Sequence, residues 1–223
     1  MDGMPATGGH AGQQSGKLGF RGRSHIEEGV GMTSDSGTER GARERLLQTA
    51  DRLFYAEGVQ TVGIDRIIDD AGVAKASLYR TFGSKDALVE AYLRRRHDAT
   101  LSRLSEAIAG TDDPREKILR VFDVQARTFT EPGFNGCAFM GASAEAVPGG
   151  TIDRAATEFR TWIRNMFVDL AKGLGVAAPE SLGRQLHVLY DGGIITARMD
   201  HDPTVADESR AAASLLIDAA TLA

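Results

Sequence analysis

Apolar residues recur three and four positions apart over most of the chain after residue 38, which is the period of amphipathic α-helices. No segment shows the alternation of a half-buried strand, and no internal repeat is present. The pattern therefore predicts an all-α protein of about nine helices. Their expected ranges are 39–56, 64–71, 75–82, 85–108, 114–130, a short helix within 134–147, 152–173, 180–198 and 205–222.

Helix-ending residues separate these segments. Gly58, Gly72 and Gly83 each follow an apolar-periodic run, where glycine adopts positive φ without steric cost. Ser84 is placed to cap the following helix, and Ser36 and Glu39 have the spacing of a capping box for the first. Residues 1–37 are rich in Gly, Ser and Thr without apolar periodicity, so we expect a disordered tail.

The segment from Gly58 to Val89 predicts two short helices around a tight turn, followed by a longer helix. In the second short helix, Leu78 and Phe82 lie four apart on the expected buried side, with Tyr79 at its border. This is a helix-turn-helix pattern, in which the second helix enters the major groove of DNA. The residues with the reach to contact bases or phosphates are Lys75, Ser77, Tyr79, Arg80, Thr81 and Lys85.

The stretch AGVAKASLYRTFGSKDALV resembles the signature of the TetR family of one-component transcriptional regulators. In that family, residues that match Ser77, Tyr79, Arg80, Thr81 and Lys85 often contact DNA. Two positions depart from the usual pattern, Ile68 in place of a small residue and Ala74 in place of a capping Ser or Thr. These departures leave the register of base contacts open by about one residue.

The resemblance implies a domain organisation. A helix-turn-helix DNA-binding domain would span residues 38–84, after the tail of 1–37. A helical ligand-binding and dimerisation domain would span 85–223, and its first long helix would connect the two. The implied function is that of a homodimeric repressor of a palindromic operator in double-stranded DNA, released by a small effector.

Charge and composition agree with this organisation. The net charge of −5 alone argues against a nucleic-acid binder, but residues 40–96 sum to +3 and residues 97–223 to −6. The single cysteine, Cys137, excludes an intramolecular disulfide and favours a reducing cytoplasm. No apolar run approaches the roughly 20 residues of a membrane span.

By the same resemblance, the second domain should hold a pocket for an apolar ligand. Candidate lining residues are Phe122, Phe129, Phe139, Met140, Trp162, Met166 and Tyr190. Helical spacing does not separate a pocket wall from plain core, so both interpretations stay open for each residue. We expect Cys137 to be a buried small hydrophobe and Asp200-His201-Asp202 a solvated turn, with no metal and no cofactor.

The last two helices are apolar over much of their length, which suits a four-helix interface between two copies. The expected interface residues are Leu182, Leu186, Leu189, Gly193, Ile194, Ala197, Leu215, Leu216, Ala219 and Ala220. Two other functions stay open beside a ligand-released repressor. One is a DNA-binding accessory protein without a ligand, and the other an enzyme carrying a helix-turn-helix, although no catalytic pattern is present.

Overall fold

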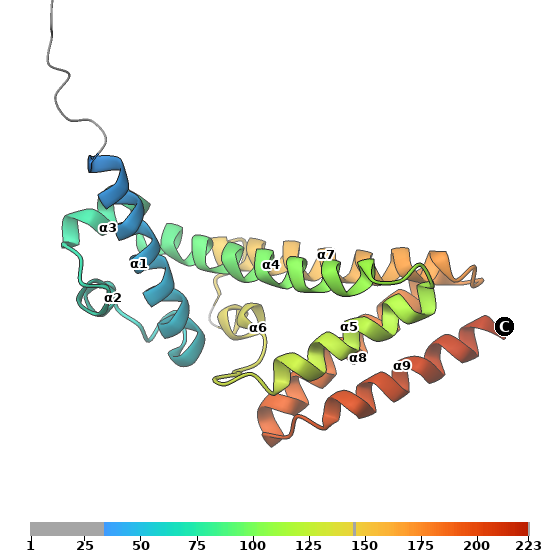
Figure 1. Ribbon diagram of the computed structural model, residues 1–223. Helices are drawn as coiled ribbons and strands as arrows, with labels where there is room; N and C mark the ends of the chain where they lie inside the picture. The colour runs from blue at the N-terminus through green and yellow to red at the C-terminus, as the bar shows by residue number, and fades with distance from the viewer. Residues whose placement is uncertain (1–33, 145, 223) are drawn as a thin grey trace, which may run out of the picture.

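The computed structural model describes residues 34–144 and 146–222, with the side chains from residue 39 onward, and this part of the chain is helical without strands. Figure 1 shows a small unit of three helices at one end of a long helical body, with the C-terminus at the far end. The helices are α1 (Ser34–Glu57), α2 (Ile64–Ala71), α3 (Lys75–Phe82), α4 (Lys85–Ala109), α5 (Pro114–Phe129), α6 (Ala138–Ser143), α7 (Thr151–Gly173), α8 (Pro179–Asp200) and α9 (Val205–Thr221). The predicted all-α fold is confirmed.

The N-terminal unit packs α2 and α3 against the apolar stripe of α1. Leu46, Ala50 and Leu53 of α1 are buried, as are Ile67 of α2 and Leu78 of α3. Gly72 ends α2 with φ of 61°, in the left-handed region that favours glycine, and its amide donates to the last carbonyls of α2. The expected helix-turn-helix is therefore formed, with the expected boundaries.

α4 begins at the predicted cap, where the Ser84 hydroxyl accepts a hydrogen bond from the Ala87 amide. Its first turns bury Leu88 and Tyr92 in the N-terminal unit, and Leu104 lies in the core of the second domain. Leu101, which the periodicity places on the apolar side, is instead 39% exposed. α4 thus links the two domains as one continuous helix.

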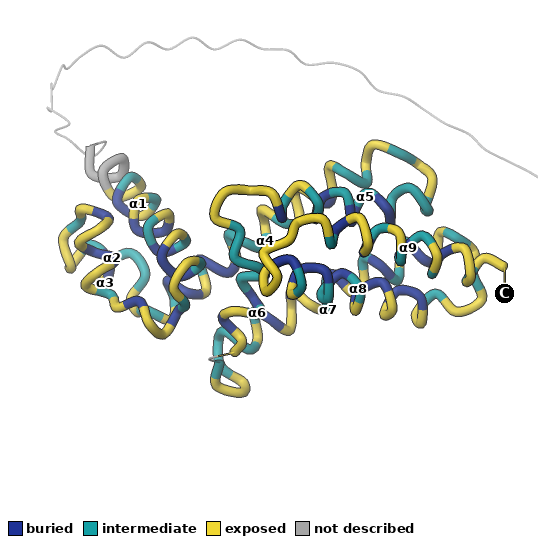
Figure 2. Tube along the Cα trace, turned by 90° about the horizontal axis from the view of Figure 1, so that it is seen from below, coloured by how far each residue is buried: buried dark blue, intermediate teal, exposed yellow. Residues whose placement is uncertain are grey.

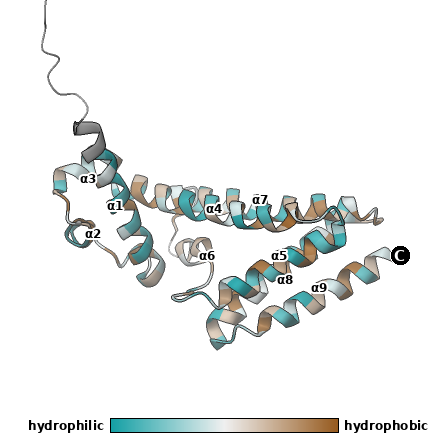
Figure 3. Cartoon of the chain, in the orientation of Figure 1, coloured by the Kyte–Doolittle hydropathy of each residue, from teal (hydrophilic) through white to brown (hydrophobic). Residues whose placement is uncertain are grey.

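In the second domain α4 and α7 lie side by side, α5 and α8 pack beneath them, and α9 packs against α5 and α8 (Figure 1). Residues buried between these helices include Phe122, Phe167 and Ile163. Buried positions follow the inward faces of the helices in Figure 2. Figure 3 shows hydrophobic and hydrophilic residues alternating along the helix turns, as amphipathic segments require.

The start of the first helix corrects one expectation. α1 begins at Ser34, about five residues earlier than predicted, so Ser36 lies inside the helix and does not cap it. The helical pattern is hard to see there because Ser, Asp, Gly and Thr have low helix propensity. Residues 1–33 of the predicted tail lie outside the described residues.

Candidate DNA-binding surface and effector cavity

One face of the candidate recognition helix α3 packs into the core of the domain, and the other face is exposed. Leu78 is fully buried, whereas Tyr79 is 47% exposed although it is a large aromatic residue. Phe82 is half-buried, with the Arg43 guanidinium 5.4 Å from its ring centroid. An exposed aromatic side chain next to a rigid anchor is available to contact a partner.

The polar candidates on α3 are held in place by neighbours within the domain. Lys75 pairs with Asp65 at 2.8 Å, and Arg80 pairs with Glu39 of α1 at 3.0 Å. The hydrogen bond and charge of Asp65 raise the pKa of Lys75, so the ammonium stays charged. Thr81 donates its hydroxyl to the Ser77 carbonyl at 2.6 Å.

Lys75, Tyr79 and Arg80 are exposed, while Ser77, Thr81 and Lys85 are half-buried. Lys85 is the first residue of α4, where the helix dipole favours an anion such as a phosphate. The six residues therefore share one end of the molecule. Their contact with DNA stays a prediction.

A cavity of about 440 Å³ lies at the junction of the two domains. Of the predicted ligand-binding residues, Phe129, Phe139 and Tyr190 line it. Met140 borders a separate groove of about 380 Å³ between α1 and α6. The cavity is within the range of roughly 300–1,000 Å³ of small-molecule sites.

Phe122, Trp162 and Met166 do not line this cavity, and their contact with a ligand stays a prediction. Phe122 is fully buried, and its ring centroid lies 5.9 Å from that of Phe167. Trp162 packs against His97, with ring centroids 5.1 Å apart. These side chains fill the space between helices, which is the core interpretation that helical spacing left open.

Helix periodicity does not indicate the part of the wall that comes from the DNA-binding domain. Asp51, Arg52, Tyr55 and Ala56 of α1 line the cavity together with residues of the second domain. Polar residues on the inner sides of α4 and α5 were also missed, namely Arg96, Thr100, Arg103, Gln125 and Thr128.

Gln125 is the most buried polar member of the wall, at 3% exposure. Its side-chain nitrogen donates to the Tyr190 carbonyl at 2.8 Å. Its oxygen Oε1 has no hydrogen-bond partner among the residues that the structure describes. An unpaired buried acceptor costs free energy, which marks this position as unusual for plain core.

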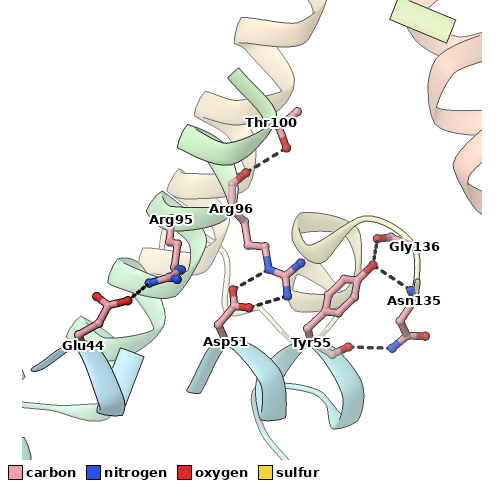
Figure 4. A network of polar contacts seen from close by, with 8 residues as sticks. All are labelled: Glu44, Asp51, Tyr55, Arg95, Arg96, Thr100, Asn135 and Gly136. Atoms are coloured by element: carbon pink, nitrogen blue, oxygen red, sulfur yellow. Dashed lines mark hydrogen bonds and ion pairs between the residues drawn. The ribbon is translucent and has the colours of Figure 1, made fainter. Parts of the chain in front are cut away.

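A polar network joins α1 to the second domain beside the cavity (Figure 4). The Tyr55 hydroxyl donates to the Gly136 carbonyl at 2.9 Å and accepts from the Asn135 amide at 2.8 Å. The Asn135 side chain donates to the Tyr55 carbonyl at 2.7 Å and accepts from Arg198 of α8 at 3.1 Å. We call Tyr55, Asn135, Gly136 and Arg198 the interdomain latch.

Cys137 follows the latch at the N-cap of α6 and lines the same cavity. Burial raises the pKa of its thiol, so the reactive thiolate is scarce at neutral pH. By its solvent exposure the residue is half-buried, so its role as a buried small hydrophobe stays a prediction. The Asp200-His201-Asp202 triplet is exposed where α8 ends, and the described residues contain no group of three or more His, Cys, Asp or Glu placed to hold a metal.

Most residues of the predicted interface on α8 are buried within the protomer, and their contact with a second copy stays a prediction. Leu182, Leu186, Gly193, Ile194 and Ala197 are buried inside the protomer. A Cβ atom at Gly193 would lie 2.7 Å from the Ser209 hydroxyl, so this glycine allows α9 to approach α8 within one chain. Their burial leaves little area for a second copy.

The opposite face of α8 carries the exposed apolar stripe. Val188 is 72% exposed, Ile195 46% and Met199 73%, and Gly192 lies between them on the same face. On α9, Leu215 is 71% exposed and Ala219 is also exposed, while Leu189, Leu216 and Ala220 are half-buried. We call Val188, Gly192, Ile195, Met199, Leu215 and Ala219 the outer stripe.

The three-helix unit, the connecting helix and the cavity together define a helix-turn-helix transcriptional regulator. Residues 46–92 match the profile described as bacterial regulatory proteins, tetR family. The crystal structure of a TetR-family transcriptional regulator from Streptomyces coelicolor aligns with a TM-score of 0.79 and 33% identity, covering 82% of this chain and 97% of that chain. The chain belongs to the TetR family of transcriptional regulators.

Named relatives match over part of their length. The HTH-type transcriptional repressor NemR of Escherichia coli K12 is 34% identical over 110 residues, which is 48% of this chain and 55% of NemR. The HTH-type transcriptional repressor KstR2 of Mycolicibacterium smegmatis is 34% identical over 80 residues, 36% of this chain and 39% of KstR2. The chain thus spans about half the length of these relatives or less. Within the described residues, no helix is long and apolar enough to cross a membrane.

Proposed function

We propose that the protein is a homodimeric repressor that binds a palindromic operator through α3 and is released by a small, largely apolar effector. The observation that carries this proposal is the junction cavity, because its wall includes both the DNA-binding domain and the effector domain. The similarity to the repressors NemR and KstR2 favours repression. A cytoplasmic location follows from the proposed operator.

The outer stripe supports the dimer. Its positions on α8 lie four, three and four residues apart, which places them on one helix face. Exposed apolar residues grouped on neighbouring helices mark an interaction surface. A second copy seated there would bury its own identical stripe, as a two-fold symmetric interface requires. The two recognition helices must then lie about 34 Å apart to enter successive major grooves.

Release would be a shift between two conformations. In one conformation the two recognition helices match successive grooves, and in the other they do not. An effector that binds the second conformation more tightly lowers operator affinity, by no more than the ratio of its affinities for the two. The alternative is a ligand-independent DNA-binding accessory protein. The cavity argues against it, since a domain that served dimerisation alone would have no need of such a space.

The test is binding of the purified protein to the DNA upstream of its own gene at several salt concentrations. We expect tight binding with a steep salt slope, which Tyr79→Ala abolishes. Tyr79→Phe is the matched control, because it keeps the ring and the helix anchor. Weak binding by wild type that is no stronger than that of Tyr79→Ala, and no stronger on the upstream DNA than on unrelated DNA, would refute the proposal.

A further inference from the structure

We propose that the effector is a neutral, largely apolar molecule that touches α1 directly, and that Tyr55 passes its presence to the DNA-binding domain by opening the interdomain latch. This inference rests on the proposed function. It adds the chemical class of the effector and the residue through which the effector acts.

The first step is the position of Tyr55. Its side chain lines the cavity and also makes two hydrogen bonds of the latch, to Gly136 and Asn135. A molecule in the cavity therefore meets the same ring that ties α1 to the second domain. No chain of intermediate residues is needed between the bound effector and the DNA-binding domain.

The second step concerns the loop at residues 135–136, which holds both hydrogen-bond partners of the Tyr55 hydroxyl. Gly136 has φ of 81°, and a Cβ atom there would lie 2.7 Å from the Arg198 side chain. The Arg198 side chain of α8 therefore lies directly against the 135–136 loop. If the Tyr55 ring moves to admit an effector, its hydroxyl loses both partners together, because Asn135 and Gly136 are consecutive residues of one loop.

The third step concerns charge. Each cation and anion of the cavity wall already has an ionic partner: Arg96 with Asp51 at 2.7 Å, Arg52 with Asp70 at 3.0 Å, Arg103 with Glu131 at 3.2 Å, and Asp191 with Arg160 at 2.7 Å. A charged effector would have to break one of these pairs or lie desolvated beside it. A neutral molecule avoids that cost.

The fourth step is the apolar share of the wall. Phe129, Phe139 and Phe159 contribute aromatic surface, and the Phe139 and Phe159 rings are stacked with centroids 3.9 Å apart. Val124 and Ile194 add aliphatic surface. Aromatic side chains such as these favour a planar apolar molecule, which contacts their rings over a large area.

Cys137 allows a test without knowledge of the natural effector, because it is the single cysteine and lines the cavity. Benzyl methanethiosulfonate, applied at alkaline pH, forms a Cys137–S–S–benzyl adduct and releases methanesulfinate. Mass spectrometry would establish complete labelling. We expect the adduct to bind the operator at least tenfold more weakly than unlabelled protein, and dithiothreitol to restore the affinity.

Two variants give the experiment its controls. Cys137→Ala treated with the reagent should keep its operator affinity. In Tyr55→Phe, labelling should weaken operator binding less than threefold, because the hydroxyl bonds that the adduct would break are already gone. A sulfonatoethyl adduct at Cys137 carries a negative charge and should label less completely or lower the melting temperature relative to the benzyl adduct.

Thr128→Phe provides the same occupancy without chemical labelling, since Thr128 also lines the cavity. Thr128→Phe alone should weaken operator binding as the benzyl adduct does. Combined with Tyr55→Phe, it should weaken operator binding no further. If the unlabelled protein binds the operator and neither the adduct nor Thr128→Phe weakens it, the inference is wrong while the repressor stands. If the unlabelled protein binds no operator, the proposed function itself fails.

Discussion

The guanidinium of Arg96 lies 3.9 Å from the ring centroid of Tyr55 while it donates hydrogen bonds to both carboxylate oxygens of Asp51, at 2.7 and 2.8 Å. One residue of the connecting helix α4 thus holds two residues of α1. Because Arg96 and Asp51 are more than two-thirds buried, this pair is screened less by water than a surface pair.

Replacement of Arg96 by Lys should therefore destabilise the protein. A lysine keeps the charge but loses the paired hydrogen bonds and the flat stacking on Tyr55, and we expect a loss of about 1–2 kcal/mol in the free energy of unfolding. Arg94→Lys is the matched control, two residues away in the same helix, because Arg94 makes an exposed pair with Glu90. Its expected loss is below about 0.5 kcal/mol, and urea unfolding would measure both. Equal losses would refute the prediction.

Lys85→Ala should weaken operator binding uniformly across DNA sequences. If its ammonium neutralises one phosphate, the slope of log affinity against log salt should decrease by about one. Lys172→Ala removes the same charge at the far end of α7, where Lys172 pairs with Asp169. An unchanged slope in Lys85→Ala, or the same change in both variants, would place Lys85 away from the phosphate backbone.

Ile195→Glu should convert the proposed dimer to monomers that remain folded. The new carboxylate would be placed in the outer stripe, where burial of an unpaired charge opposes association. Leu186→Glu offers a contrast, because Leu186 is fully buried in the protomer and its replacement should unfold the chain. Sedimentation velocity with circular dichroism would separate the outcomes. A dimeric Ile195→Glu protein would show that the copies meet elsewhere.

The free energy of unfolding should fall on acidification below about pH 6.5, the ordinary pKa of histidine. Burial lowers the pKa of His187 in the fold, against the opposing effect of Asp191, while Arg160 and Arg164 lower it further. The unfolded chain therefore binds a proton more readily than the folded one, and stability is lost as the pH falls toward the folded pKa.

His187→Gln should flatten this part of the pH profile, as thermal unfolding at several pH values would show. The pKa of the Glu44 carboxyl is lowered chiefly by its hydrogen bond to Arg95. Its effect on the free energy of unfolding therefore falls at lower pH and should be the same in the variant. A variant with the slope of wild type between about pH 6.5 and 5 would exclude His187 as the cause.

The sequence predicted the local features of this protein well, because they depend on neighbours along the chain. Gly72, Ser84 and the buried Leu78 each follow from helix periodicity and capping. The face of α8 that would meet a second copy was harder to predict, because both faces of that helix carry apolar residues. Leu186 packs within the protomer and Ile195 faces outward, and the spacing of apolar residues alone does not distinguish them.

Only some residues of the cavity wall were named from the sequence, because the rest depend on how the two domains pack. Phe129 and Tyr190 were recognised as aromatic residues of the second domain, and they line it. Tyr55 was missed because it is about 80 residues from its partners Asn135 and Gly136, so their contact depends on how the two domains pack. Spacing within one helix carries no information on such a pair.

The share of the cavity wall that comes from α1 bears on how this regulator could be recombined with others. Exchange of the DNA-binding domain between family members is a natural way to give an effector domain a new operator. Here the exchange would also replace Asp51, Arg52 and Tyr55, and with them one side of the cavity wall. Under the proposed function, operator choice and effector choice are not separate modules, and a chimera that keeps its response to the effector would need to retain the inner face of α1.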